Sequence, residues 1–285
     1  MELRCVLDNV QGLVDSLSAV RWKKQQDAIC EVSEHGLVII VEEWGCLQAR
    51  VYYRKELFVS YEYSAESRPR FGVSLGLLVD TLSTFSSTGT TGLELSYPGS
   101  DMQLLLKLTD ADNTCIYAEI RTKVTDTVPK EYSVDGDGGR RAVFAVKSAA
   151  LKEAIDDLEW PGSSISITIS PDPAGVILRG EGHHGDLQID FPYDAHNELF
   201  AAFQCQSEVS YSYKYKFLRA TTANVPNSVT KDNRGSKLTI GAGGLLKVQH
   251  LISLRQAQQH NMDPNPTQQG RVSYVEFYLM PDEEA

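Results

Sequence analysis

Cysteine is scarce in this sequence and is not arranged as a metal site. Five cysteines are scattered over 285 residues, and no two of them form a CxxC pair. A structural zinc site needs closely spaced thiolates, and a disulfide framework needs an even set in an oxidising compartment. The pattern therefore argues against both, and it favours free, mostly buried thiols in a reducing compartment.

Long apolar runs are missing as well. No stretch approaches the roughly 18 residues that a helix needs to cross a bilayer. Residues 1–6 do not place a basic segment before an apolar one, so we expect no secretory signal. The sequence predicts no membrane partner.

Positive charge is in short supply. Lysine and arginine together number 27, aspartate and glutamate 38, and the formal net charge is −11. Because cations that neutralise phosphates supply most non-specific affinity for nucleic acid, a protein that grips nucleic acid with its whole surface is disfavoured. A protein that gathers its few cations on one inner face is still compatible with this balance.

The motifs of common catalytic and ligand sites do not occur. There is no GxSxG, HExxH or Walker motif, and the glycine-rich residues 241–244 precede a strand pattern instead of a helix. Asp135-Gly136-Asp137-Gly138 has Val146 where a calcium loop places its glutamate. His183-His184 lies in a glycine-flanked turn without an evident fourth ligand. We predict no catalytic residue, no metal and no cofactor.

What the sequence does contain is a repeat of about 140 residues. Leu47-Gln48 recurs as Leu187-Gln188, and Glu56-Leu57-Phe58 recurs as Glu198-Leu199-Phe200. Apolar positions at helical spacing also correspond, 141 residues apart: Val10, Leu13, Val14 and Leu17, then Leu151, Ala154, Ile155 and Leu158. A solenoid repeat would be shorter, about 20–50 residues. The spacing therefore indicates a duplicated domain.

Each half follows one order of strands and short helices. The first half has helical patterns that end near residue 20 and cover 75–85, and the second half has them at 148–158 and 216–224. Residues 122–141 between the halves have little apolar patterning. We predict domains at 1–121 and 142–285, a connecting loop at 122–141, a polar loop at 256–269 and an acidic tail.

These halves resemble the DNA sliding clamps. Gly72-Val73-Ser74-Leu75 and Tyr278-Leu279-Met280-Pro281 are similar to motifs of PCNA. Four further motifs resemble the Rad-one family of subunits of the 9-1-1 checkpoint clamp: Leu7-Asp8-Asn9-Val10, Asp232-Asn233-Arg234-Gly235, Val275-Glu276-Phe277-Tyr278 and Pro281-Asp282-Glu283-Glu284. The likeness covers essentially the whole chain, and the order of the motifs is specific. The chain departs from this subunit pattern by extra residues near 236–243 and 256–269.

The resemblance implies an α+β fold of two tandem PCNA-like domains, with antiparallel sheets outside and four short helices inside. Duplex DNA would pass the helices without being read by sequence, so the contacts would be to phosphates. The implied DNA-channel residues are Arg21, Lys152, Lys216 and Arg219. The second helix departs from the family pattern, because Asp80 stands where PCNA has lysine. Glu153, Asp156 and Asp157 add acidic charge to the third helix.

The resemblance also implies partners. Edge strands would pair with neighbouring subunits in a ring, and the implied interface residues are Leu104, Leu106, Ile116, Ile177, Leu187 and Ile189. Client peptides would dock beside the connecting loop, at Val124, Val128 and Tyr132. Glu42 and Glu43 stand near that pocket, so the clients could differ from those of PCNA. Two other clamp subunits, a clamp loader, and repair and signalling proteins are the implied partners, in the nucleus.

Two alternatives stay open. One is a replication-type homotrimeric clamp. The other is a metal-dependent DNA exonuclease, which would need carboxylates clustered around two cations about 4 Å apart. The adjacent pairs Glu42-Glu43 and Asp156-Asp157 diverge on a strand or helix. Asp186 and Asp190 would be separated by roughly 13 Å along a strand, so the exonuclease is the weaker alternative.

Overall fold

The structure is a computed structural model that describes residues 3–8, 10–43, 45–64, 70–86, 92–110, 112–125, 127–134, 141–226, 235–253 and 272–283. The glycine-aspartate run at 135–139, the 256–269 loop and the last two residues of the tail lie outside this set. The described chain forms two compact units. Unit 1 comprises Met1–Val41, Arg50–Pro129 and Ile252–Val275, and unit 2 comprises Glu42–Ala49, Lys130–Leu251 and Glu276–Ala285. The domain boundaries expected from the sequence stay a prediction.

The first repeat contains nine strands and two helices within the described residues. They are β1 (Leu3–Leu7), α1 (Val10–Ala19), β2 (Asp27–Ser33), β3 (Gly36–Glu43), β4 (Leu47–Arg54), β5 (Ser60–Tyr63), β6 (Arg70–Ser74), α2 (Leu75–Ser86), β7 (Gly92–Tyr97), β8 (Leu104–Thr109) and β9 (Cys115–Ile120), with a 3-10 turn, η1 (Lys55–Leu57), before β5. The strands lie in the orders β5-β1-β7-β8-β9 and β4-β3-β2-β6.

The second repeat has the same element order. It comprises β10 (Ala142–Lys147), α3 (Ser148–Asp157), β11 (Ser164–Pro171), β12 (Ala174–Gly182), β13 (Gly185–Pro192), β14 (Phe200–Gln204), β15 (Val209–Lys214), α4 (Tyr215–Ala220), β16 (Gly235–Ile240), η2 (Ala242–Gly244), β17 (Leu246–Ser253) and β18 (Val272–Leu279). Its strand orders, β14-β10-β16-β17-β18 and β13-β12-β11-β15, match those of the first repeat position by position.

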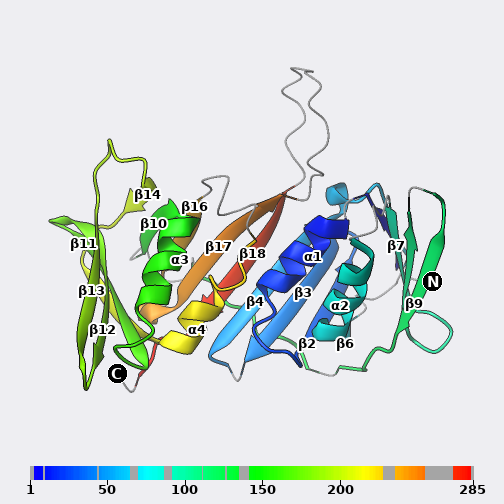
Figure 1. The fold of residues 1–285 in the computed structure, drawn as a ribbon, viewed down its shortest axis with the longest axis horizontal. Coiled ribbons are helices and arrows are strands. Elements are labelled where there is room, and N and C mark those ends of the chain that lie inside the picture. Colours follow the sequence, from blue (N-terminus) through cyan, green and yellow to red (C-terminus); the bar gives the residue numbers. More distant parts are fainter. Residues whose placement is uncertain are drawn as a thin grey trace. The chain divides into compact units, whose positions relative to one another are not determined.

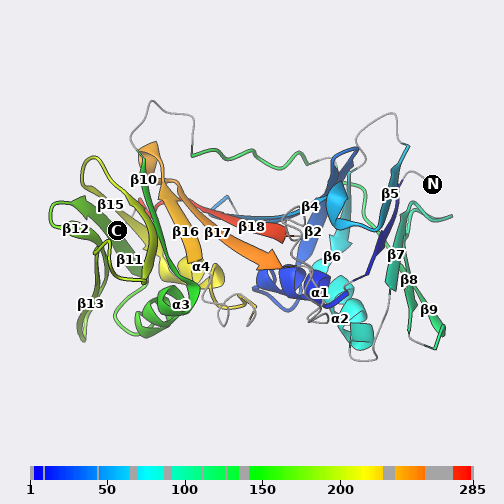
Figure 2. The same cartoon turned by 90° about the horizontal axis from the view of Figure 1, so that it is seen from above.

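The helices of each repeat lie side by side on one face of that repeat's sheets (Figures 1 and 2). The four apolar positions expected on the first helix are buried in α1, and those expected on the third are buried in α3 and at Leu158 directly after it. Burying one such side chain stabilises the fold by about 1.5–3 kcal/mol. The expected α+β architecture of antiparallel sheets and four short helices is therefore confirmed in the described residues.

Two details differ from the sequence-based expectation. α4 ends at Ala220, before the predicted end near residue 224. The apolar pattern at residues 175–178 predicts a short strand there, whereas β12 extends to Gly182. β12 continues because it pairs with β13 as far as Gly182 opposite Gly185. The two strands form a hairpin closed at His183-His184, and the apolar pattern of β12 ends at Leu178 because Arg179, Gly180 and Glu181 follow it.

Two parts of the connecting loop, at Lys123 and Lys130, are each held by the unit to which they belong. In unit 1, Gly72 and Lys123 exchange two backbone hydrogen bonds of 2.8 Å, and Lys123 Nζ lies 2.6 Å from Asp27 Oδ2. In unit 2, Gln48 Nε2 donates to the Lys130 carbonyl at 2.9 Å. These described parts of the loop are therefore anchored, although the sequence has little apolar patterning there.

A buried polar network in unit 2 connects α3 and α4 to the sheet. His250 on β17 is buried, with Nδ1 2.8 Å from Ser236 Oγ and Nε2 2.7 Å from the Thr221 carbonyl oxygen. Ser236 Oγ lies 2.7 Å from Ser148 Oγ, on the first residue of α3. Because a carbonyl oxygen only accepts, Nε2–H is the donor in the neutral ring and Nδ1 accepts from Ser236. Burial lowers the pKa of His250 to about 4.

We expect this histidine to make the stability depend on pH. The pKa of His250 is about 4 in the folded state against an ordinary value of 6.5, so between these values the unfolded state binds the proton first and stability falls as the pH drops. His250→Gln should remove this component and lower the unfolding free energy at pH 7.5 by roughly 1–3 kcal/mol. Urea unfolding of both proteins at pH 7.5 and 5.5 measures the difference; identical pH dependence would contradict it.

Candidate functional site

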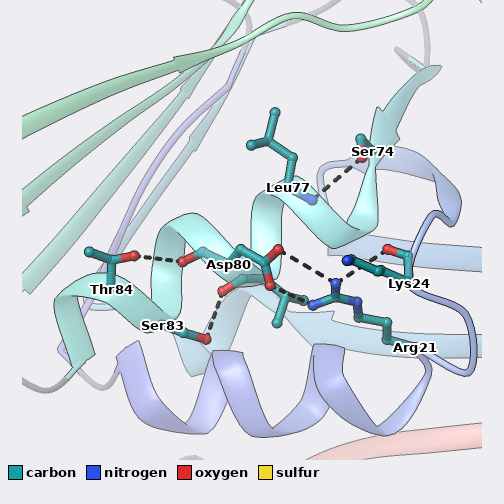
Figure 3. Close-up of polar contacts among 8 residues, drawn as sticks. Arg21, Lys24, Ser74, Leu77, Asp80, Ser83 and Thr84 are labelled. Carbon is teal, nitrogen blue, oxygen red and sulfur yellow. Dashed lines mark hydrogen bonds and ion pairs between the residues drawn. The ribbon is translucent and has the colours of Figure 1, made fainter.

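In the first repeat, the arginine predicted to face DNA is held in an ion pair. Arg21 follows α1, and its Nη1 donates to Asp80 Oδ1 on α2 at 2.6 Å (Figure 3). Its Nη2 donates to the Lys24 carbonyl at 3.3 Å. The Arg21 side chain is 20% exposed and the Asp80 side chain 66%. The carboxylate is therefore the more accessible member of the pair.

Gly76 on α2 leaves room for this arrangement. A Cβ at this position would lie 2.7 Å from the Lys24 carbonyl oxygen and 3.3 Å from Arg21 Nη2. Contacts of 2.7 Å are shorter than real Cβ atoms make. The absent side chain thus allows α2 to lie against the turn that carries Arg21 and Lys24.

In the second repeat, two more predicted cations pair with carboxylates. Lys152 Nζ lies 2.7 Å from Asp156 Oδ2, one turn further along α3. Arg219 on α4 donates from Nη1 to Glu159 Oε1 at 2.8 Å, and its Nε lies 3.7 Å from Asp156 Oδ1. Asp156 therefore stands between Lys152 and Arg219, and the four side chains form one network.

Lys216 differs from these three cations. It lies in the first turn of α4 and is exposed, with Nζ 4.6 Å from the centre of the Phe217 ring. Among the described residues it has no carboxylate partner in an ion pair. Its neighbour Tyr215 is buried, and burial raises the pKa of the Tyr215 hydroxyl. Lys216 is therefore the predicted channel residue with the most available charge.

The helices themselves carry more negative than positive charge. Their sequences contain three cations and five carboxylates: Lys152, Lys216 and Arg219 against Asp15, Asp80, Glu153, Asp156 and Asp157. Sequence reasoning missed Lys23 and Lys24, which are exposed in the turn after α1. The run Trp22-Lys23-Lys24 was the signal that could have drawn attention to them.

The residues predicted for client docking lie in different surroundings. Tyr132 stacks on Tyr278 with ring centres 5.9 Å apart. Val124 and Val128 are 89% and 70% exposed. Gln48 bonds to both Glu42 and the Lys130 carbonyl, which places the Glu42 carboxylate beside the loop that leads to Tyr132. Of the three predicted residues, Tyr132 is the one with a defined aromatic contact, and its role in docking stays a prediction.

The predicted interface residues divide between edge and interior strands. Leu104 and Leu106 are buried on β8, and Ile177 lies on β12, but both strands have neighbours on either side. This part of the expectation needs correction, because an interior strand already uses its backbone groups within its own sheet. Ile116 on β9, and Leu187 and Ile189 on β13, lie on strands at the end of the sheet order.

Comparison with known proteins assigns the chain to a family. The family described as "Repair protein Rad1/Rec1/Rad17" matches residues 2–252. The chain belongs to this family. Curated relatives include the "Cell cycle checkpoint protein RAD1" of Mus musculus and that of Homo sapiens. Each is 29% identical over 289 residues, with 98% of this chain and 91% of the relative covered. The recognition of a Rad-one type clamp subunit is confirmed.

The fold of this family member is similar to that of a solved clamp. PCNA from Thermococcus kodakaraensis superposes with a TM-score of 0.73, covering 98% of this chain and all of the other, at 16% sequence identity. At that identity the likeness concerns the fold alone.

The described part of this Rad1-family chain forms no cluster of metal-binding side chains. There, no group of three or more histidine, cysteine, aspartate or glutamate side chains comes close enough to hold a metal ion. Asp186, one of the carboxylates considered for a nuclease, pairs with Arg179 at 3.2 Å. None of the described helices combines the length and apolar character needed to cross a membrane.

Gly76→Ala should destabilise the protein. Helix propensity alone would make alanine better by about 1 kcal/mol, but its Cβ would collide with the Lys24 carbonyl, 2.7 Å away. We expect a net loss of roughly 1–3 kcal/mol, measured by urea unfolding. Gly92→Ala is the control, because the nearest atom to its Cβ would be the Leu7 carbonyl oxygen at 3.8 Å. A stabilised Gly76→Ala protein would refute the packing argument.

Proposed function

We propose that this chain is a non-catalytic subunit of a ring-shaped, heterotrimeric checkpoint clamp of the 9-1-1 type. The ring encircles duplex DNA in the nucleus and recruits DNA-damage signalling and repair proteins. The observation that carries the proposal is that a Rad1-family sequence has a PCNA-like fold over 98% of its length. Checkpoint proteins named RAD1 are its relatives over the same extent.

The internal repeat supports a specific mode of ring closure. By position, β9 corresponds to β18, and β13 corresponds to β4. Within unit 2, Met280, one residue after β18, donates its N–H to the carbonyl of Cys46, the residue before β4, at 3.0 Å. In the proposed ring, β9 of one subunit pairs with β13 of the next in the corresponding way. Such a head-to-tail contact closes into a ring when its rotation allows.

A heterotrimer fits the charges better than a homotrimer. Three copies of helices with five carboxylates and three cations each would surround DNA with net negative charge. Two more basic partner subunits would supply the missing cations. Loading would need a separate ATP-driven clamp loader, because the chain has no Walker motif. Client proteins would dock near Tyr132, and no cofactor takes part.

The edge-strand mode of assembly can be tested with Ile116→Glu. Ile116 is 36% exposed on β9, and burying a charge there without a partner should weaken assembly about tenfold or more. Mixing the chain with its two partner subunits, followed by light scattering, measures the stoichiometry. The wild type should form a 1:1:1 complex and should not trimerise alone.

Val59→Glu is the matched control for this substitution. Val59 is 57% exposed and precedes β5, at the other end of the same strand order. It should assemble like the wild type. If the Ile116 and Val59 variants assembled equally well, β9 would not be part of the subunit interface. A stable self-trimer would instead favour the homotrimeric, replication-type clamp.

Lys216 provides the test of DNA contact. In the assembled ring, Lys216→Glu should weaken binding to duplex DNA. It should also make the plot of log affinity against log salt shallower by about 0.9, the value for one lost phosphate contact. Lys55→Glu on η1, an exposed lysine outside the four α-helices, should change neither quantity. The DNA should stay intact in Mg²⁺, whereas its degradation, abolished by a single carboxylate substitution, would favour the exonuclease.

A further inference from the structure

Three of the four predicted channel cations already have an anionic partner within their own repeat. Arg21 pairs with Asp80, Lys152 with Asp156, and Arg219 with Asp156 and Glu159. Each of these pairs joins residues of the helices or of the turns that follow them. A DNA phosphate that approaches one of these cations must therefore displace a carboxylate that is already bound to it.

The exposed fractions of the paired side chains show how accessible each carboxylate and each cation is to solvent. Asp80 is 66% exposed while Arg21 is 20% exposed, and Glu159 is 61% exposed while Arg219 is 43% exposed. At Lys152 and Asp156 the two values are nearly equal, 34% and 37%. Asp80 and Glu159 are thus more accessible than their cations, and Asp156 is slightly less exposed than Arg219, 37% against 43%. None of the three cations presents its charge alone.

A carboxylate and a phosphate compete for the same donors. Both accept charge-assisted hydrogen bonds from guanidinium and ammonium groups. A carboxylate tethered in place acts at an effective concentration in the millimolar range or above, whereas each phosphate of the duplex must replace it. The exposed pairs themselves contribute little to stability, about 0–1 kcal/mol each, so they can open without unfolding the helices.

We propose that Asp80 and Asp156 are built-in competitors of DNA phosphate, which keep the contacts of this subunit with DNA weak and short-lived. This inference rests on the proposed clamp function and adds a regulatory role for two acidic residues, one on the helices of each unit. A ring that binds loosely through this subunit moves along DNA while its partners hold the duplex. In this scheme the two carboxylates set how firmly the inner face grips DNA.

The test is the double variant Asp80→Asn with Asp156→Asn in the ring assembled with its two partner subunits. The amides keep the shape of the side chains and remove the competing charges, so that Arg21 and Lys152 become available, whereas Arg219 keeps its pair with Glu159. Binding to a short linear duplex, measured by fluorescence anisotropy between 50 and 200 mM salt, should become roughly 3- to 10-fold tighter. The log–log salt dependence should steepen by about 0.9 for each cation that gains a phosphate.

A charge-matched control separates competition from general electrostatics. Asp15→Asn with Asp157→Asn also removes one carboxylate from the helices of each repeat. Among the described residues, neither Asp15 nor Asp157 pairs with a cation; Asp15 Oδ1 accepts from Gln11 Nε2 at 2.6 Å. This variant should tighten binding much less and leave the salt dependence close to that of the wild type. Thermal unfolding confirms that both double variants are folded.

The outcomes distinguish the inference from the function on which it rests. Equal tightening in both double variants would mean that only the summed charge matters, and it would overturn the inference. No change in either variant would overturn it as well. Encirclement is tested separately, by blocking both ends of the duplex with bulky groups. Wild-type binding that does not need a free end would overturn the proposed clamp function and this inference with it.

Discussion

The constraint on which this structure depends is that the backbone groups of antiparallel strands need partners. The strands of each repeat follow two orders of neighbours, and the second repeat has the same two orders as the first. In unit 2 the end of β18 meets the start of β4 through the bond from Met280 to Cys46. Strands β9 and β13 each have one neighbour in the described chain and correspond in the repeat to β18 and β4, and this correspondence is why they are the proposed sites of subunit pairing.

The helices show how a clamp-like fold can be kept while its surface charge changes. Their apolar faces are buried against the sheets, and that burial supplies the stability. Their exposed faces need only be polar, so carboxylates such as Asp80 and Asp156 can replace or neutralise cations without harm to the fold. The electrostatic character of the surface is therefore free to vary among members of a family with one architecture.

Part of the fold and of the candidate site could be predicted from the sequence. The apolar stripes of α1 and α3 have the 3.6-residue period that burial on one face requires, so their positions followed from the pattern. The extent of β12 did not, because it depends on pairing with β13. The assignment of Leu104, Leu106 and Ile177 to edges failed for the same reason: neighbours in a sheet are decided by topology, and a strand's own residues do not specify them.

The ion pairs could not be predicted from the sequence. Arg21 and Asp80 are 59 positions apart, and their contact depends on Gly76, which lets α2 approach the turn after α1. The sequence by itself determined that the chain is a duplicated α+β protein with sliding-clamp motifs and few cations, because periodicity, repeats and composition are local or additive properties. Only the tertiary structure decided which cations are neutralised and which strands are edges, because both depend on distances between residues remote in the chain.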